Sequence, residues 1–448
     1  MPDILQDAAL RACRYLESLP HRSVAPRPDA LAALSGLDEP LSEGGTPPAS
    51  TLELLDRLVS PATMAMAGPR FFGFVIGGSR PEALAARWLA SAWDQNAALA
   101  APTPGVARLE EIALRWLIDV LRLPEGTAAG FVTGATVANF TALAAARHAV
   151  LARHGWNVEA NGLFRAPEIM VIVGAEAHPT LIKSLGLLGL GRSRVHAVPV
   201  DAQGRMRAAA IPAIKGPTIV CLQAGNINTG AFDPAQSIIP VARAAGAWVH
   251  VDGAFGLWAR ASKQLSPLAA GIELADSWAT DAHKWLNVPY DSGIAFVRDS
   301  NALKAAMAIT AEYLPTQNAA RNPCDFTPEL SRAARGVEIW AVLRTLGRAG
   351  LAELFERNCR QARRFAQGLA AANFRILNEV ALNQVLIDFG GDERTRRVIA
   401  AVQSEGTCWA GPTVWQGRTA MRLSVCNWAT QDEDVERSIA AIVRAAGM

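Results

Sequence analysis

The sequence has no excess of charge of either sign. Its 448 residues include 43 lysines and arginines against 41 aspartates and glutamates, which gives a formal net charge of +2. Proteins that bind nucleic acid or an anionic membrane surface need a basic patch, and no cluster of lysines and arginines here is long enough to suggest one. The charge balance therefore argues against both kinds of partner.

Long apolar runs are also missing. The most apolar stretch, residues 238–259, contains Arg243, His250 and Asp252, so it does not predict a membrane-spanning helix. The opening MPDILQDAAL has no basic leader before an apolar segment, so we expect no signal peptide. These absences favour a cytoplasmic protein.

Cysteine and tyrosine are both scarce. None of the six cysteines lies within four residues of another, which excludes a zinc pair and a redox CxxC motif. A chain of this length does not need disulfides, so we expect reduced thiols and no metal site. The three tyrosines are Tyr15, Tyr290 and Tyr313.

The remaining composition is that of a folded protein. Hydrophobic residues make up 50% and charged residues 19% of the chain, which excludes disorder. The length predicts two or three domains. We expect an N-terminal helical segment over 1–66, a large domain over 67–350 and a small α+β domain over 351–448.

From about residue 130, short β-rich runs alternate with runs rich in alanine and leucine. This alternation predicts a mainly parallel sheet with helices on both faces, in which ligands bind beyond the carboxyl ends of the strands. The expected strands are 169–173, 195–199, 218–223, 247–252, 277–280 and 293–297, with two later ones at 384–388 and 420–425. The expected helices are 5–18, 51–66, 135–153, 179–188, 206–214, 234–245, 351–372 and 431–446.

The first strand end with chemical potential is FVTGAT at 131–136, where Gly134, Ala135 and Thr136 open a helix. Free amides at a helix N-terminus, together with the helix dipole, can bind an anion. The segment lacks the lysine of GxxxxGK[ST] and the spacing of GxGxxG, so it suits a phosphate monoester better than a nucleotide. Taken alone, it is more often a plain turn between strand and helix.

Three further strand ends carry polar side chains. Asp252 ends an apolar strand, and a buried carboxylate there needs a cation or several donors, unless it only caps the next segment. Lys284 follows another strand; a desolvated lysine is an amine nucleophile that can form a Schiff base, whereas a surface lysine is the alternative. His178 follows a third strand in AEAHPT.

One ligand, pyridoxal 5′-phosphate (PLP), matches all four strand ends. Its phosphate would bind the helix N-terminus, and its aldehyde would react with Lys284. Asp252 would keep the pyridine nitrogen protonated, which makes the ring an electron sink, and His178 would stack on the ring.

The ordered motifs resemble those of the group II PLP-dependent amino-acid decarboxylases, which include aromatic-amino-acid and glutamate decarboxylases. The likeness covers about residues 55–445. The matching stretches are FVTGATVANFTALAAAR (131–147), AEAHPT (175–180), NTGAFDP (228–234), HVDGAFG (250–256), TDAHKWLNVPYDSG (280–293) and MRLSVCN (421–427). The resemblance implies the aspartate aminotransferase fold (fold type I): an α/β large domain with a mainly parallel seven-stranded sheet, and a small α+β domain.

The resemblance also implies roles for individual residues. Lys284 matches the Schiff-base lysine, Asp252 the pyridinium partner and His178 the stacking histidine. The implied cofactor-binding residues are Gly134, Ala135, Thr136, His178, Asn228, Asp252, His283 and Lys284. Asn228 stands where animal members have a threonine-rich turn, so its contact with the ring is open.

The implied reaction is decarboxylation of an L-amino acid with an apolar or aromatic side chain, through a Lys284 aldimine and a quinonoid stabilised by Asp252. Phe72 and Phe74 in the segment FFGF match a stretch that lines the substrate cleft, although a core aromatic cluster explains them equally well. Arg422 could bind the substrate carboxylate, or it could form an ion pair between domains.

Many members protonate the product carbon with a tyrosine on a loop near the dimer partner's site. The corresponding loop here, about 314–330, has no tyrosine; it contains Phe326, and Tyr313 lies at its edge. The proton donor is then Tyr313, His178 or water. Alternatively, the protein catalyses another reaction, as an aldehyde synthase or as a carbon–carbon lyase (aldolase).

The resemblance further implies a homodimer with the active site at the interface. A cofactor-binding protein without activity is a third hypothesis, against which the intact lysine, aspartate and histidine set argues.

Overall fold

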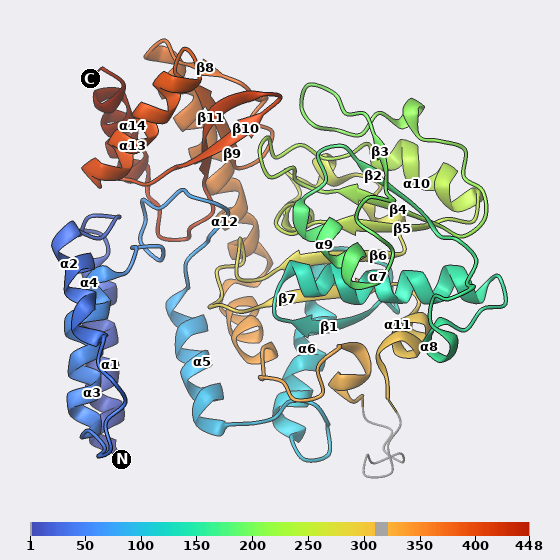
Figure 1. The fold of residues 1–448 in the computed structure, drawn as a ribbon, viewed down its shortest axis with the longest axis horizontal. Helices are drawn as coiled ribbons and strands as arrows, with labels where there is room; N and C mark the ends of the chain where they lie inside the picture. Colours follow the sequence, from blue (N-terminus) through green and yellow to red (C-terminus); the bar gives the residue numbers. More distant parts are fainter. Residues whose placement is uncertain (1, 310–320, 448) are drawn as a thin grey trace. The chain divides into compact units, whose positions relative to one another are not determined.

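The computed structural model describes residues 2–309 and 321–447 (Figure 1). Contacts divide the chain into two compact units, each built from segments distant in sequence. The larger unit comprises Ser79–Arg360 and Asn378–Gln384, and the smaller unit comprises Met1–Gly78, Gln361–Leu377 and Val385–Met448. The division at residues 66 and 350 expected from the sequence stays a prediction, because grouping by contacts does not test which segments fold independently.

A seven-stranded sheet forms the centre of the larger unit, with the strand order β1-β7-β6-β5-β4-β2-β3. Neighbouring strands from β6 to β3 are parallel, whereas β7 is antiparallel to both β1 and β6. The strands are β1 (Ala128–Val132), β2 (Met170–Gly174), β3 (His196–Val198), β4 (Thr218–Gln223), β5 (Trp248–Asp252), β6 (Ser277–Asp281) and β7 (Gly293–Val297). The expected α/β fold with a mainly parallel seven-stranded sheet is confirmed.

Burial on both faces explains why these strands read as continuous apolar runs. Every residue of β5, β6 and β7 is buried. The helices of this unit are α5 (Pro81–Trp93), α6 (Pro104–Val120), α7 (Ala135–Ala152), α8 (Val158–Asn161), α9 (Pro179–Leu187), α10 (Ala235–Ala244) and α11 (Ser300–Met307). Short 3₁₀ helices cover Ala208–Ala210, Gly256–Ala261, Ser266–Ala269, Ile272–Leu274 and Pro323–Phe326.

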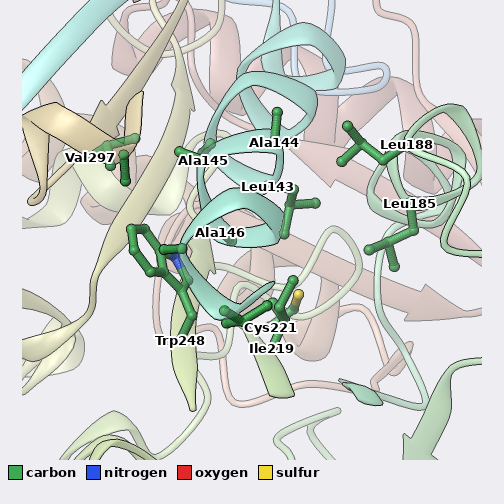
Figure 2. Packing of buried hydrophobic residues seen from close by; sticks show 14 of the residues in the cluster. Leu143, Ala144, Ala145, Ala146, Leu185, Leu188, Ile219, Cys221, Trp248 and Val297 are labelled. Atoms are coloured by element: carbon green, nitrogen blue, oxygen red, sulfur yellow. The ribbon is translucent and has the colours of Figure 1, made fainter. Parts of the chain in front are cut away.

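Helix α7 is the helix that matters most for the site. Its buried face is rich in alanine, which lets the helix lie close to its neighbours; Figure 2 shows this face together with Trp248 of β5 and with Leu185 and Leu188 at the end of α9. Because α7 follows β1 directly, this packing fixes the N-terminus of α7 at the carboxyl end of the sheet.

The helix expected over 206–214 is wrong. Only Ala208–Ala210 form a 3₁₀ turn, and Ile211 is already extended, with φ −67° and ψ 126°. Pro212 explains the difference, because a proline disfavours the helical conformation of the residue before it.

The smaller unit combines both ends of the chain. Its sheet has the order β10-β11-β9-β8, with β8 (Arg375–Ile376), β9 (Gln384–Asp388), β10 (Gly411–Trp415) and β11 (Arg418–Ser424). Its helices include α1 (Pro2–Ser18), α2 (Pro28–Ala32), α3 (Pro48–Leu54), α4 (Ser60–Ala62), α13 (Asp392–Glu405) and α14 (Asp432–Ala446), with a 3₁₀ turn at Ala33–Leu37 and a π turn at Leu55–Val59. The long helix α12 (Gly336–Ala371) belongs to the larger unit up to Arg360 and to the smaller unit from Gln361. It is interrupted at Gly347, whose φ of 56° is left-handed.

Among the described residues, no helix is both long enough and apolar enough to cross a membrane.

Candidate active site

The polar residues singled out in the sequence lie at one edge of the larger unit's sheet. Strands β1, β2, β4, β5 and β6 run in the same direction, so their carboxyl ends meet there. Gly134 follows β1, His178 follows β2, Asp252 ends β5, and Lys284 follows β6. This edge is where an α/β sheet binds its ligands.

The N-terminus of α7 forms the candidate anion site. Gly134 is in backbone contact with the start of β7, since a Cβ on Gly293 would lie 2.5 Å from the Gly134 Cα. The Ala135 amide donates a hydrogen bond to Asp281 Oδ1 at 2.6 Å. The next amides, at Thr136 and Val137, belong to the first turn, which has no intrahelical acceptors. The turn therefore presents N–H donors to an anion and already holds one carboxylate.

Asp281 is a site residue that the sequence reasoning missed. Its buried carboxylate accepts from the Ala135 amide through Oδ1, and its Oδ2 lies 3.0 Å from Lys284 Nζ. Asp281 thus places a carboxylate at the N-terminus of α7 and holds the Lys284 amine beside it.

Lys284 is only partly exposed, with 19% of its side chain accessible. A small ligand can therefore reach the Lys284 amine, which the Asp281 carboxylate holds in place. Its neighbour His283 accepts a hydrogen bond at Nδ1 from the Ser292 amide (3.0 Å), so in the neutral ring Nε2 carries the proton, 3.5 Å from Asp281 Oδ1. Burial lowers the pKa of His283, which favours that neutral form.

Tyr290 is a second residue that the sequence reasoning left without a role. Its ring stacks on His283 with 4.3 Å between the ring centroids. Its side chain is largely exposed and lies next to the residue that precedes Lys284.

Asp252 and His178 line the same small cavity, together with Gln223 at the end of β4. Asp252 is 4% exposed and accepts hydrogen bonds from the Ala254 amide at 3.2 Å and from Asn139 Nδ2 at 3.1 Å. The imidazole of His178 accepts at Nδ1 from the Thr180 amide (3.3 Å), which fixes the ring at the start of α9.

Asn228 lies in a tight turn after β4. Its amide donates to Asn226 Oδ1 at 2.8 Å, and the same oxygen accepts from the Thr229 amide. The Asn226 side chain therefore holds the turn, while a contact of Asn228 with a cofactor stays a prediction.

The residues expected to bind substrate belong to the smaller unit. Phe72 is 1% exposed and packs edge-on against Phe365, as in a core cluster, whereas Phe74 is 56% exposed. Burial lowers the pKa of Arg422, on β11, to about 10, so it is still cationic at neutral pH. Their substrate roles stay predictions. Tyr313, one of the candidate proton donors, lies outside the described residues.

The donor set fits PLP. It offers a primary amine for the aldehyde, a buried carboxylate for the pyridine nitrogen, an imidazole for the ring face and a helix N-terminus for the phosphate. These groups on a mainly parallel α/β sheet define a PLP-dependent enzyme of fold type I.

The chain belongs to the pyridoxal-dependent decarboxylase family, since the family model described as "Pyridoxal-dependent decarboxylase conserved domain" matches residues 34–389. Tryptophan decarboxylase 1 of Oryza sativa subsp. japonica is 27% identical over 433 residues, which cover 88% of this chain and 83% of that protein. L-2,4-Diaminobutyrate decarboxylase of Rhizobium meliloti (strain 1021) is 29% identical over 427 residues, covering 90% and 83%.

Two further matches bear on the reaction and the fold. Phenylacetaldehyde synthase of Arabidopsis thaliana is 25% identical over 365 residues, covering 75% of this chain and 73% of that protein. The crystal structure of Oryza sativa TDC with PLP and tryptamine has a TM-score of 0.91 at 23% identity and covers 100% of this chain and 97% of the other. The protein is thus a PLP-dependent amino-acid decarboxylase, and its relatives differ in substrate.

Proposed function

We propose that the protein decarboxylates an L-amino acid with an apolar or aromatic side chain, using Lys284, Asp252 and His178. The observation that carries this proposal is that the three residues follow or end strands at one edge of the sheet, with Asp252 and His178 on one cavity. The relative named tryptophan decarboxylase supports an aromatic substrate. The absence of disulfides among the six cysteines, all of them described, supports a reducing, cytoplasmic location.

When bound, PLP would supply an electron sink for the carbon that loses CO₂. Lys284 Nζ would hold the aldehyde carbon, after leaving Asp281 and losing a proton. Asp252 would keep a proton on the pyridine nitrogen, because a buried carboxylate stabilises a cation beside it. His178 would cover one ring face and exclude water there.

The amides at Ala135 and Thr136, with His283, would bind the phosphate. Since Asp281 accepts from Ala135, we propose that phosphate binding displaces this carboxylate or shares the turn with it. Arg422, still cationic at neutral pH, would pair with a substrate carboxylate, and Phe74 would contact its side chain.

A second candidate function is decarboxylative aldehyde synthesis. It is favoured by the relative named phenylacetaldehyde synthase and by the absence of tyrosine from residues 314–330. In that reaction the amino acid, O₂ and water yield CO₂, ammonia, an aldehyde and hydrogen peroxide, with O₂ as the oxidant and water as the source of the aldehyde oxygen. The two reactions divide at the step where a proton reaches the product carbon. A carbon–carbon lyase activity would instead leave the carboxylate in place and release no CO₂.

The product ratio tests this choice. With aromatic L-amino acids we expect the wild-type holoenzyme to release CO₂ with amine as the main product. Replacing the proton donor should lower amine formation about 10²–10⁴-fold and raise the share of aldehyde and peroxide. The measurement is the yield of CO₂, amine, aldehyde and peroxide for wild type, Tyr313→Phe, His178→Gln and Tyr290→Phe. If none of the three variants changes the ratio, no one of these residues is the required donor.

We also propose that the protein is a homodimer with the active site at its interface. Of the 19 large hydrophobic side chains exposed in the described residues, 11 lie within the first 93 residues. Exposed apolar surface concentrated in one segment is typical of an interface. Light scattering should give about twice the chain mass of 47.6 kDa. A fully active monomer would contradict the proposal.

A further inference from the structure

Behind Asp252 lies a row of buried polar side chains that the proposed chemistry does not use. Asn139, on α7, and His250, on β5, are both 0% exposed, and Asn139 Oδ1 lies 2.8 Å from His250 Nε2. His250 Nδ1 lies 2.9 Å from Ser277 Oγ, on β6. Ser277 Oγ in turn accepts from the Trp248 indole at 2.9 Å. The row thus links residues of α7, β5 and β6 to the Asp252 carboxylate.

The direction of each hydrogen bond follows from the Asp252 end. An ionised carboxylate only accepts, so Asn139 must turn its Nδ2–H toward Asp252 (3.1 Å) and its Oδ1 toward His250. His250 must then carry its proton on Nε2, which leaves Nδ1 as an acceptor. Ser277 must donate its hydroxyl proton to that nitrogen.

The other end of the row is compatible with this assignment. The Trp248 indole can only donate, so it occupies one lone pair of Ser277 Oγ and leaves the hydroxyl proton to be donated to His250. The two ends therefore agree on one arrangement in which every donor points along the row toward Asp252. Such a chain of aligned hydrogen bonds strengthens each member.

Burial lowers the pKa of His250 to about 3. The ring is therefore neutral at any pH used to assay the enzyme, and the direction of the row does not reverse.

We propose that Asn139, held by His250 and Ser277, is a positioning residue that fixes the Asp252 carboxylate toward the pyridine nitrogen of PLP. The proposal rests on the proposed function of Asp252. The Asn139 and Ala254 donors, one on each carboxylate oxygen, prevent the carboxylate from rotating. Loss of the row would let the carboxylate rotate and would weaken its hold on the protonated ring.

The test compares His250→Leu with His250→Gln. Leucine removes the donor to Asn139, whereas the glutamine amide can still donate from a position near that of Nε2. We expect PLP to bind cofactor-free His250→Leu about tenfold or more weakly, with a changed pH titration of the cofactor's visible absorbance, and His250→Gln to restore both. Asn139→Leu should resemble His250→Leu. If His250→Leu does not fold, Ser277→Ala, which removes the donor to Nδ1, takes its place.

Thr141→Val is the matched control. Thr141 is buried in the same helix and donates only to the Val137 carbonyl, so its loss tests general damage to α7. The inference is overturned if His250→Leu and Asn139→Leu bind PLP and titrate like Thr141→Val. Asp252→Asn in the same assay separates the two claims. If it changes affinity and spectrum while the row variants do not, only the positioning role fails; if it also changes nothing, the proposed role of Asp252 fails.

Discussion

Lys284→Ala is expected to abolish turnover, by on the order of 10³-fold or more, and to eliminate a borohydride-reducible bond to PLP. The reason is that the variant has no amine at the end of β6 to react with the aldehyde. The fold should be retained, because the lysine forms its ion pair with Asp281 and its side chain is partly exposed. The measurements are amine formation, the visible absorbance of the cofactor and the melting temperature.

Lys263→Ala is the control for this experiment. Lys263 is an exposed lysine of the larger unit, so its removal should leave all three measurements at the wild-type level. A Lys284→Ala protein that still forms a reducible PLP adduct would remove Lys284 from the mechanism.

Asp252→Ala should have the second-largest effect, and a larger one than Asp252→Glu. Removing one partner of a buried ion pair typically costs about 3–5 kcal/mol, and here it also removes the group that keeps the pyridine nitrogen protonated. Glutamate keeps the charge but displaces it by one methylene. The measurements are kcat/KM and the dissociation constant of PLP.

Asp276→Ala provides a matched control, because Asp276 is also a buried aspartate but precedes β6 at the opposite end of the sheet. Its carboxylate accepts from the Val249 amide and lies 3.3 Å from Arg243. Its loss should lower stability without a specific loss of PLP affinity. Near-wild-type rates and PLP affinity in Asp252→Ala would refute the role of Asp252.

Much of the fold is readable in the sequence because strands buried on both faces leave continuous apolar runs. The strands expected at 218–223 and 293–297 match β4 and β7 residue for residue. The expected helix at 206–214 is wrong because Pro212 prevents the alanine-rich run before it from continuing as a helix. Local composition therefore predicts strands such as β4 and β7 well, and it fails where a single residue such as Pro212 prevents the helix that the surrounding residues favour.

The site was only partly predictable, for a different reason. Lys284, His178 and Asp252 are visible because each stands next to a strand end. Asn139 sits inside a helix, where no local pattern signals its contact with a residue 113 positions later. The position of His250 could be predicted from the sequence. Residues two apart on a strand point to the same face, so His250 lies on the same face of β5 as Asp252.

Asp281 was equally accessible in principle. It stands three residues before Lys284 and ends a wholly buried strand, and a buried carboxylate needs a partner. The hydrogen bond to Ala135, however, joins residues 146 positions apart, and only the antiparallel insertion of β7 between β1 and β6 brings them together. Contacts of this kind follow from sheet order, which motif spacing does not encode.

Identifying the lysine that reacts with PLP tests the central claim most directly. The wild-type protein is incubated with PLP, reduced with borohydride and digested, and the modified peptide is sequenced by mass spectrometry. The account predicts one reduced PLP group per chain, on Lys284 between His283 and Trp285. A label on another lysine, or no label at PLP concentrations that support turnover, would contradict it.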